Sequence, residues 1–274
     1  MATKVTDLKT RGACARAIAD LGYSFRKILS SPEANPKVYK NTLQGVFTAP
    51  LHLAPAKLSG YEVCPQRTEG CTRACLHTAG NPLYQSSKNT SRIHKTKAYM
   101  ENRPLFMNLL ILEIEAHYKA SQFMDMACGL RLNATSDIPW ERVSFTYKCQ
   151  PYANLMEMFP QIQFYDYTKR SNRKNLPGNY HLTFSLAEDN MNQAIAAANN
   201  GMNVAVVMNV GRTKPLPKRF SLRNTRREID LPVYDGDVHD YRPSDPPGHI
   251  IGLRAKGLAR GDTSGFVQDV SLQV

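Results

Sequence analysis

The sequence predicts an α/β fold: a parallel β/α barrel or partial barrel with an N-terminal helical extension. From about residue 129 onward, short apolar segments that end in polar residues alternate with helical segments, and strands that alternate with helices lie parallel in one sheet. Segment 202–209 (MNVAVVMN) is apolar at nearly every position, as expected for a strand buried on both faces. The five or six strand–helix units favour a barrel or partial barrel, with a doubly wound sheet as the second choice.

The N-terminal part predicts a helix followed by the first strand. Apolar residues recur at helical spacing over residues 7–31, and Pro32 and Pro36 end that segment. We therefore assign residues 1–36 to an N-terminal helical extension and linker, and residues 37–274 to the barrel-like domain. Residues 43–54 (LQGVFTAPLHLA) alternate and run apolar, which predicts a strand leading into a loop that contains cysteines.

The remaining elements follow in order along the chain. Pro104 suits the first turn of the clearest predicted helix, and Gly201 suits the C-terminal cap of an alanine-rich one. The predicted helices cover residues 86–103, 104–121, 151–158 and 191–201. The predicted strands cover residues 129–137, 161–170, 179–190, 202–209 and 249–257.

Composition and charge place the chain among ordinary globular proteins. It has 274 residues, of which 42% are apolar and 21% charged, which is not the composition of a disordered chain. No apolar run of about 18 residues predicts a membrane span, and the N-terminus lacks the apolar core of a secretory signal. We therefore expect a cytoplasmic protein, in which six cysteines are a poor disulfide framework and a better metal set.

Three of the six cysteines fall within one twelve-residue segment, CPQRTEGCTRAC. Thiolates of Cys64, Cys71 and Cys75 that converge from one loop are typical of a soft-metal site or an iron–sulfur cluster. Three ligands rather than four leave a metal position open to water or substrate. The alternatives are buried free thiols, a redox pair, or a Cys3His zinc site that His77 completes.

Polar residues follow each predicted strand, where ligands of α/β barrels bind. The candidates are Asn133, Thr135, Ser136 and Asp137; Asp166, Thr168 and Lys169; Thr183, Ser185 and Glu188; and Arg254 and Lys256. Each set could instead cap the helix that follows it. Because the placement repeats from strand to strand, we expect one shared site, with the cysteine loop opening onto the same face.

The order of a strand, a three-cysteine loop and then strands that end in Ser136-Asp137, Thr168-Lys169 and Ser185-x-x-Glu188 resembles the radical S-adenosylmethionine superfamily. It is most similar to uncharacterised phage-encoded members with a glycine before the middle cysteine, here Gly70. The resemblance covers about residues 43–257. It implies that the three cysteines hold a [4Fe–4S] cluster whose fourth iron binds S-adenosylmethionine, and that reduction cleaves this cofactor to a 5′-deoxyadenosyl radical. Ser136, Asp137, Thr168, Lys169, Ser185, Glu188 and Arg254 would then surround the cofactor, and a phage-encoded protein would act in the host cytoplasm.

The net charge of +12 is concentrated in residues 85–103 and 211–227, which hold many lysines and arginines and only one acid. Such stretches predict contact with phosphates of a nucleotide or nucleic acid, unless they are only a solvated surface. A non-catalytic, metal-stabilised basic protein that binds nucleic acid or a host protein is therefore the alternative to an enzyme.

Other motifs add little. Segment 235–240 (DGDVHD) holds three acids and a histidine and could bind a hard cation, although a surface turn is the better expectation. No P-loop, G-x-G-x-x-G or G-x-S-x-G motif occurs, so nucleoside triphosphate hydrolysis, dinucleotide binding and serine hydrolysis are unsupported.

Overall fold

A computed structural model describes residues 8–78 and 85–270 of the chain. Its centre is an eight-stranded sheet in the order β1-β2-β5-β6-β7-β10-β9-β8, in which every neighbouring pair is parallel except β8 and β9. The strands of this sheet are β1 (Val46–Pro50), β2 (Ala127–Arg131), β5 (Gln163–Thr168), β6 (Tyr180–Ser185), β7 (Val204–Met208), β8 (Arg219–Arg223), β9 (Glu228–Asp235) and β10 (Ile250–Arg254). A separate hairpin pairs β3 (Phe145–Tyr147) with β4 (Gln150–Tyr152).

The prediction of an α/β fold with a largely parallel sheet is confirmed. The first five strands of the sheet follow one another in chain order, and β10 then inserts between β7 and β9. Among the described residues no strand pairing joins β8 to β1, so the structure shows an open sheet and no closed barrel.

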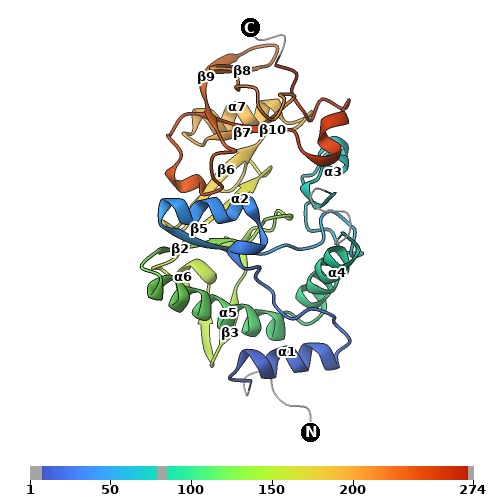
Figure 1. The fold of residues 1–274 in the computed structure, drawn as a ribbon, viewed down its shortest axis with the longest axis vertical. Coiled ribbons are helices and arrows are strands. Elements are labelled where there is room, and N and C mark those ends of the chain that lie inside the picture. Colours follow the sequence, from blue (N-terminus) through green and yellow to red (C-terminus); the bar gives the residue numbers. More distant parts are fainter. Residues whose placement is uncertain (1–7, 79–84, 271–274) are drawn as a thin grey trace.

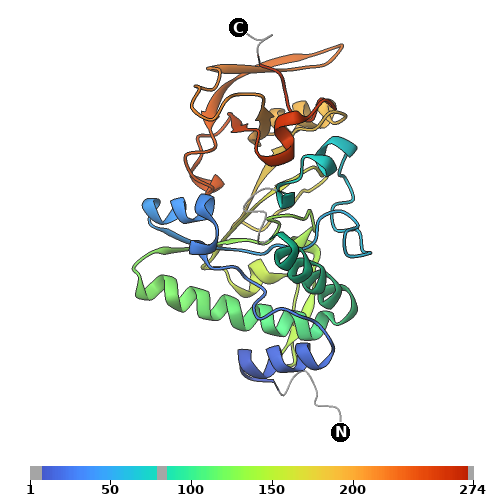
Figure 2. The ribbon, with the colours of Figure 1, turned by 45° about the vertical axis from the view of Figure 1, so that its right-hand side comes forward.

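Helices cover the sheet and line its ends (Figures 1 and 2). The long helix α5 packs on β1 and β2, and α1 packs on α5, at the end of the molecule opposite β8 and β9 (Figure 1). The α-helices are α1 (Arg11–Asp20), α2 (Pro36–Tyr39), α3 (Glu69–Arg73), α4 (Gln85–Glu101), α5 (Arg103–Phe123), α6 (Leu155–Met158) and α7 (Met191–Asn199). The 3-10 turns are η2 (Pro32–Ala34), η3 (Lys40–Gln44), η4 (Leu76–Thr78), η6 (Trp140–Arg142), η7 (Arg242–Ser244) and η8 (Gly257–Gly261).

The N-terminal segment packs onto the main hydrophobic cluster of the molecule. Ile18 and Ile28 are buried in the cluster that α5 and the strands β2 and β5 also build. The carboxylate of Glu113 on α5 accepts hydrogen bonds from the backbone N–H groups of Ile28 and Leu29, the latter at 2.7 Å. The predicted helix over 7–31 is only partly correct, because α1 ends at Asp20. The chain then continues without a helix to Ile28 and Leu29, which Glu113 binds.

Two hairpins are missing from the predictions. β8 forms the edge of the sheet and β9 lies next to it. Three of the five residues of β8 and all residues of β9 are half-exposed or exposed, so neither has the continuous apolar pattern of a central strand. Pro232 within β9 also argues against a strand in sequence, but it lies just before the residues of β9 that pair with β10. Among the described residues, no helix combines the length and the apolar character needed to cross a membrane.

Candidate functional site

The cysteine loop runs from the C-terminal end of β1 to α3 and η4. Cys64 lies in the loop, Cys71 lies on α3, and Cys75 follows that helix. Thr68 begins α3 as its N-cap and accepts a hydrogen bond from the Cys71 N–H at 3.0 Å, as expected for threonine at a helix start. The loop therefore has a defined local structure of its own.

Glu188, which follows β6, holds α3 in place. Its carboxylate accepts hydrogen bonds from the Gly70 N–H at 2.6 Å and from the Thr68 hydroxyl at 2.7 Å. A carboxylate is favourable at a helix start, where backbone N–H groups lack partners. A Cβ on Gly70 would lie 2.7 Å from the Glu188 carboxylate and 2.9 Å from Cβ of Phe266, so only glycine fits this contact. Glu188 thus positions the cysteine loop.

The three cysteines form no disulfide among the described residues, and their side chains are partly exposed. Burial raises the pKa of Cys64 to about 12, and the nearby Cys75 and Cys71 contribute to the rise. Among the described residues, no three His, Cys, Asp or Glu side chains form a group that could hold a metal ion. The side chain of His77, the predicted fourth zinc ligand, lies outside the described part of the structure.

Asp137 connects the cysteine loop to the ends of β2 and β5. Its backbone N–H donates to the Val63 carbonyl at 2.8 Å, next to Cys64. Its carboxylate accepts from the Thr168 hydroxyl at 2.8 Å and from the Lys169 N–H at 2.9 Å. The residues predicted at these two strand ends therefore do lie together, beside the first cysteine.

Lys169 extends this arrangement to β6 and to the C-terminal segment. Its ammonium donates to the Ser185 hydroxyl at 2.8 Å and lies 5.3 Å from the centre of the Phe266 ring. Phe266 and Ala74 form a small buried cluster against which Cys71 packs. Figure 1 shows η8, of the same C-terminal segment, beside α3, so Lys169 and the cysteine loop occupy the same end of the sheet.

Ser136, Asn133 and Arg254 also have partners within the protein. Ser136 donates to the Asn133 side chain at 2.8 Å, and Asn133 in turn donates from its N–H to buried Asp166 at 2.6 Å. Arg254 lies at the end of β10, where its guanidinium contacts Asp235 at 2.9 Å and Asp237 at 3.3 Å. Among the described residues no hydrogen bond or ion pair links Arg254 to the cysteine loop, and the two acids already neutralise its charge.

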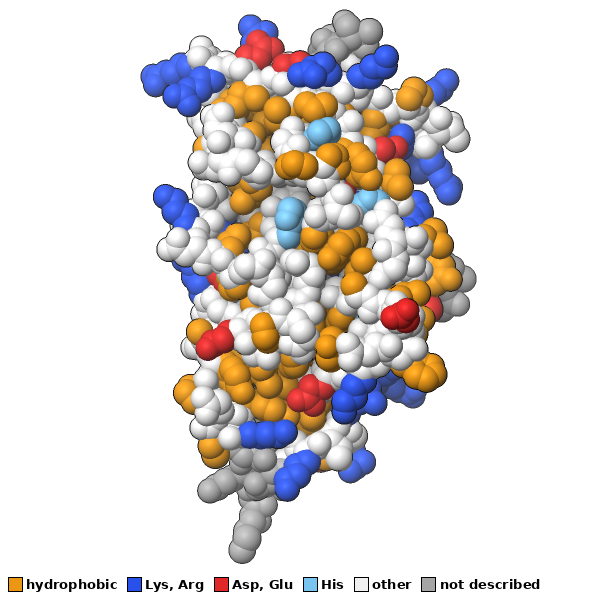
Figure 3. Space-filling view, turned by 90° about the vertical axis from the view of Figure 1, so that its left-hand side faces the viewer, with side chains coloured by type: hydrophobic (Ala, Val, Ile, Leu, Met, Phe, Trp, Pro, Cys, Tyr) orange, Lys and Arg blue, Asp and Glu red, His pale blue; other side chains and the backbone are white. Residues whose placement is uncertain are grey.

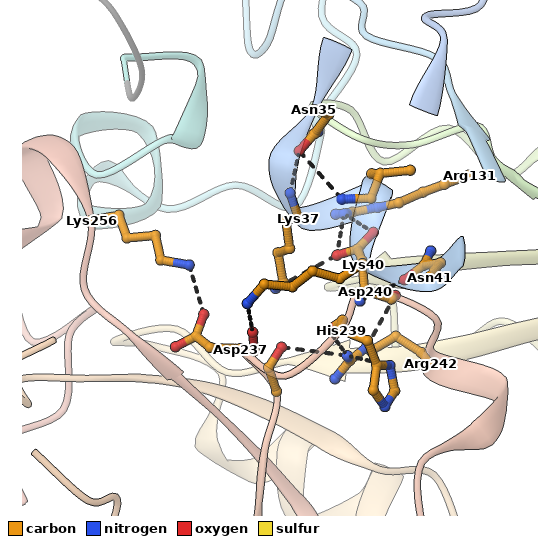
Figure 4. A network of polar contacts seen from close by, with 12 residues as sticks. Asn35, Lys37, Lys40, Asn41, Arg131, Asp237, His239, Asp240, Arg242 and Lys256 are labelled. Carbon is orange, nitrogen blue, oxygen red and sulfur yellow. Dashed lines mark hydrogen bonds and ion pairs between the residues drawn. The ribbon is translucent and has the colours of Figure 1, made fainter. Parts of the chain in front are cut away.

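The sequence did not reveal a buried ionic cluster on the sheet, shown in Figure 4. Asp240 accepts two hydrogen bonds from Arg131 on β2, at 2.9 and 2.8 Å, and lies 3.5 Å from the ammonium of Lys37 on α2. Burial alone would raise the pKa of Asp240, but the charges of Arg131 and Lys37 outweigh it and hold that pKa at about 2. No sequence signal could find this cluster, because Arg131 and Asp240 lie 109 residues apart.

The acidic side chains of segment 235–240 form ion pairs with lysine and arginine side chains of the protein. Asp237 pairs with Lys256 at 2.6 Å, and the acids on either side of it pair with Arg254 and Arg131. His239 is buried and interacts with Tyr234 at 3.0 Å. The segment is a turn after β9, as expected, but half of it is buried rather than at the surface.

Comparison with known proteins identifies a family. A model of the family described as "Gene product 88" matches residues 26–270. No curated protein matches the chain, and no solved structure does. The match covers the sheet, the cysteine loop and the strand-end residues, and the chain belongs to the Gene product 88 family.

Proposed function

We propose that the chain is an iron–sulfur protein in which Cys64, Cys71 and Cys75 hold a [4Fe–4S] cluster, and that it works as a divergent radical S-adenosylmethionine enzyme. One observation carries the proposal: three cysteines that form no disulfide come from one loop to the end of a parallel sheet where Asp137, Lys169 and other strand-end side chains also lie. Ligands of α/β proteins bind at this end of the strands.

A [4Fe–4S] cluster and a single zinc ion place three cysteine sulfurs at different distances from one another. Tetrahedral zinc with bonds of about 2.3 Å to sulfur would bring the sulfurs to about 3.8 Å of one another. In a [4Fe–4S] cluster each cysteine binds a different iron, so the sulfurs stand further apart. Cys71 and Cys75 contribute to the raised pKa of Cys64, but among the described residues no three side chains are grouped to hold a metal ion. The choice of a cluster therefore rests on the three cysteines of one loop and not on their spacing.

The protein supplies positioning and charge around such a cluster. Glu188 and Thr68 fix the helix that carries Cys71, and Asp137 fixes the backbone of Lys169. With three cysteine ligands, one iron would lack a protein ligand and would offer a site for the amino and carboxyl groups of S-adenosylmethionine. The Lys169 ammonium, held by Ser185, would then attract the carboxylate of that ligand.

The binding of any metal must displace a proton from Cys64. Burial raises the pKa of that thiol to about 12, and a metal binds the thiolate. Cluster assembly should therefore become more complete as the pH of the reconstitution is raised.

The test is anaerobic reconstitution with iron and sulfide, followed by iron analysis and a visible absorption spectrum. We expect bound iron and the broad visible absorption of an iron–sulfur cluster, which zinc lacks. Changing any one of Cys64, Cys71 and Cys75 to serine should lower the iron content, and the triple variant should bind none. Cys149→Ser is the control, because Cys149 is an exposed lone cysteine. Full iron content in the triple variant would refute the proposal.

The cofactor is tested separately by calorimetry on the cluster-loaded protein. We expect S-adenosylmethionine to bind, and Lys169→Met to weaken its binding about tenfold by loss of one charge-assisted contact. An adenosine thioether that lacks the amino and carboxyl groups of S-adenosylmethionine should bind weakly, and equally so, to the wild-type protein and to Lys169→Met. If the cluster-loaded protein does not bind S-adenosylmethionine, the proposal of an iron–sulfur cluster stands, but the proposal of a radical S-adenosylmethionine enzyme is overturned.

The second candidate is a zinc-stabilised, non-catalytic binding protein. It is supported by the hydrogen bonds that Asp137, Ser185 and Glu188 already make within the protein, because groups paired in this way need no substrate. Zinc in the purified protein, together with no iron uptake, would favour this candidate.

A further inference from the structure

The two basic stretches of the sequence differ in what their charges do. On α4 the ammonium of Lys95 is buried and donates to the Ile28 carbonyl at 2.9 Å, and Arg92 is partly buried. In residues 211–227 every lysine and arginine is exposed. Figure 3 shows lysine and arginine at both ends of this face, one of them the end that β8 and β9 form, while the middle of the face has few.

The turn between β8 and β9 is held in a fixed shape. The side-chain oxygen of Asn224 accepts hydrogen bonds from the N–H groups of Arg226 and Arg227, at 2.8 and 2.7 Å. Its side-chain amide donates to Asn192 on α7 at 2.7 Å. Phe220 and Leu222 of β8 are buried in the same hydrophobic cluster as α7 residues. The turn is thus tied to the helix instead of moving freely.

Between the turn and α7 lies a hollow of about 540 Å³. Its lining includes the amides of Asn192 and Asn224 and the two arginines of the turn. Among the described residues, no ion pair involves the side chain of Arg226 or Arg227, whereas Arg219 and Arg223 nearby pair with Asp230 and Glu228. Two guanidinium groups without acidic partners therefore face solvent at a concave polar surface.

We propose that this surface, named here the hairpin pocket and formed by α7 and residues 224–227, binds the phosphate backbone of a nucleic acid. Guanidinium groups suit phosphate because they can donate two parallel hydrogen bonds. A nucleic acid carries a regular row of phosphates, which suits the two adjacent guanidinium groups of Arg226 and Arg227. A concave polar surface fits a polynucleotide strand better than a flat membrane.

The α7 side of the hairpin pocket lies close in sequence to Glu188, which holds the cysteine loop. Glu188, which holds α3, is only four residues before Asn192, so their Cα atoms are at most about 14 Å apart. A nucleic acid bound in the hairpin pocket could therefore pass close to the cysteine loop. Binding itself needs no metal, and the inference stands whether or not the proposed cluster exists.

The test uses fluorescence anisotropy with a labelled single-stranded oligonucleotide on the full chain. We expect binding whose affinity falls at least tenfold as salt rises from about 50 to about 200 mM. Arg226→Glu with Arg227→Glu should weaken binding at least about tenfold at low salt, and should reduce the salt dependence by about two counterions. Thermal unfolding checks that the double variant is folded.

The matched control changes net charge equally at the other end of the molecule. Arg16→Glu with Lys119→Glu alters exposed residues of α1 and α5 and should leave binding within about twofold. Equal losses in both double variants, or no binding at low salt, would overturn the proposal. Polyglutamate that binds as tightly as the oligonucleotide would overturn the assignment to nucleic acid. The Cys64→Ser variant should bind the oligonucleotide normally, which separates this result from the metal proposal.

Discussion

Asp166 shows how a single residue at this site departs from its behaviour in water. It is fully buried beneath the strand ends and accepts hydrogen bonds from the Asn133 N–H at 2.6 Å and the Tyr180 hydroxyl at 2.8 Å. Burial raises its pKa to about 7, although both donors favour the charged form. The folded protein therefore holds this carboxyl in its neutral form more readily than the unfolded chain does.

We predict that Asp166→Asn changes how stability depends on pH. A carboxyl with a raised pKa contributes stability that is complete below its unfolded pKa of 3.8 and is lost as the pH rises through 7. Relative to Asp166→Asn, the wild-type protein should therefore lose up to about 4 kcal/mol between about pH 4 and pH 7. Urea unfolding of both proteins across this range measures the difference. Asp189→Asn, which changes an exposed carboxylate, is the control, and parallel curves for wild type and Asp166→Asn would contradict the prediction.

At the residue scale the sequence predicts where a side chain lies better than it predicts which residue that side chain contacts. The Asp137 carboxylate meets Thr168 and Lys169 because parallel strands end at one edge, a rule that can be applied to the sequence alone. The contact of Glu188 with Gly70 joins residues 118 apart, and no local pattern encodes it. The sequence analysis singled out Gly70 for its place before Cys71 and Glu188 for its place after a strand, and it did not predict that the two are in contact.

At the scale of elements, α3 is fixed by a close approach that a single methyl group would break. A Cβ at Gly70 would lie 2.7 Å from the Glu188 carboxylate and 2.9 Å from Cβ of Phe266, so α3 or segment 262–266 would have to move. We predict that Gly70→Ala lowers the free energy of unfolding by about 1–3 kcal/mol and lowers metal uptake by the reconstituted protein. Denaturant unfolding and iron analysis measure the two effects.

The matched control is Gly178→Ala, because a Cβ there meets nothing within 4 Å. That variant should keep its metal content and change stability by less than about 0.5 kcal/mol. A Gly70→Ala protein with wild-type stability and metal uptake would show that α3 needs no close contact here.

Elements with a buried face were predictable, and elements at the edges were not. The central strand β7 has an unbroken apolar run, and α5 has a broad apolar surface, so burial marks both in the sequence. β8 alternates exposed residues with buried Phe220 and Leu222, and β9 is at least partly exposed throughout, so neither shows the continuous apolar run of a central strand. α1 stops early because Gly22 takes a φ of +84°, a left-handed conformation that ends helices.

At the scale of the whole molecule, Asp240 joins three distant parts of the chain. Its carboxylate contacts Arg131 of β2 and Lys37 of α2, and its backbone N–H donates to the Asn41 side chain at 2.8 Å. Figure 4 shows these side chains converging from α2 and from the segment after β9. The N-terminal segment, the sheet and the C-terminal segment thus share one buried charge.

We predict that Asp240→Asn is strongly destabilising. The asparagine has nearly the same shape but leaves the buried guanidinium of Arg131 without its counter-charge, and an uncompensated buried charge costs about 3–5 kcal/mol. Asp230→Asn is the matched control, because Asp230 pairs with Arg219 at an exposed site, where an ion pair contributes at most about 1 kcal/mol. Urea unfolding measures both variants. Equal effects would mean that the cluster around Asp240 is hydrated like the surface pair, and that the three parts of the chain are held together by the hydrophobic clusters alone.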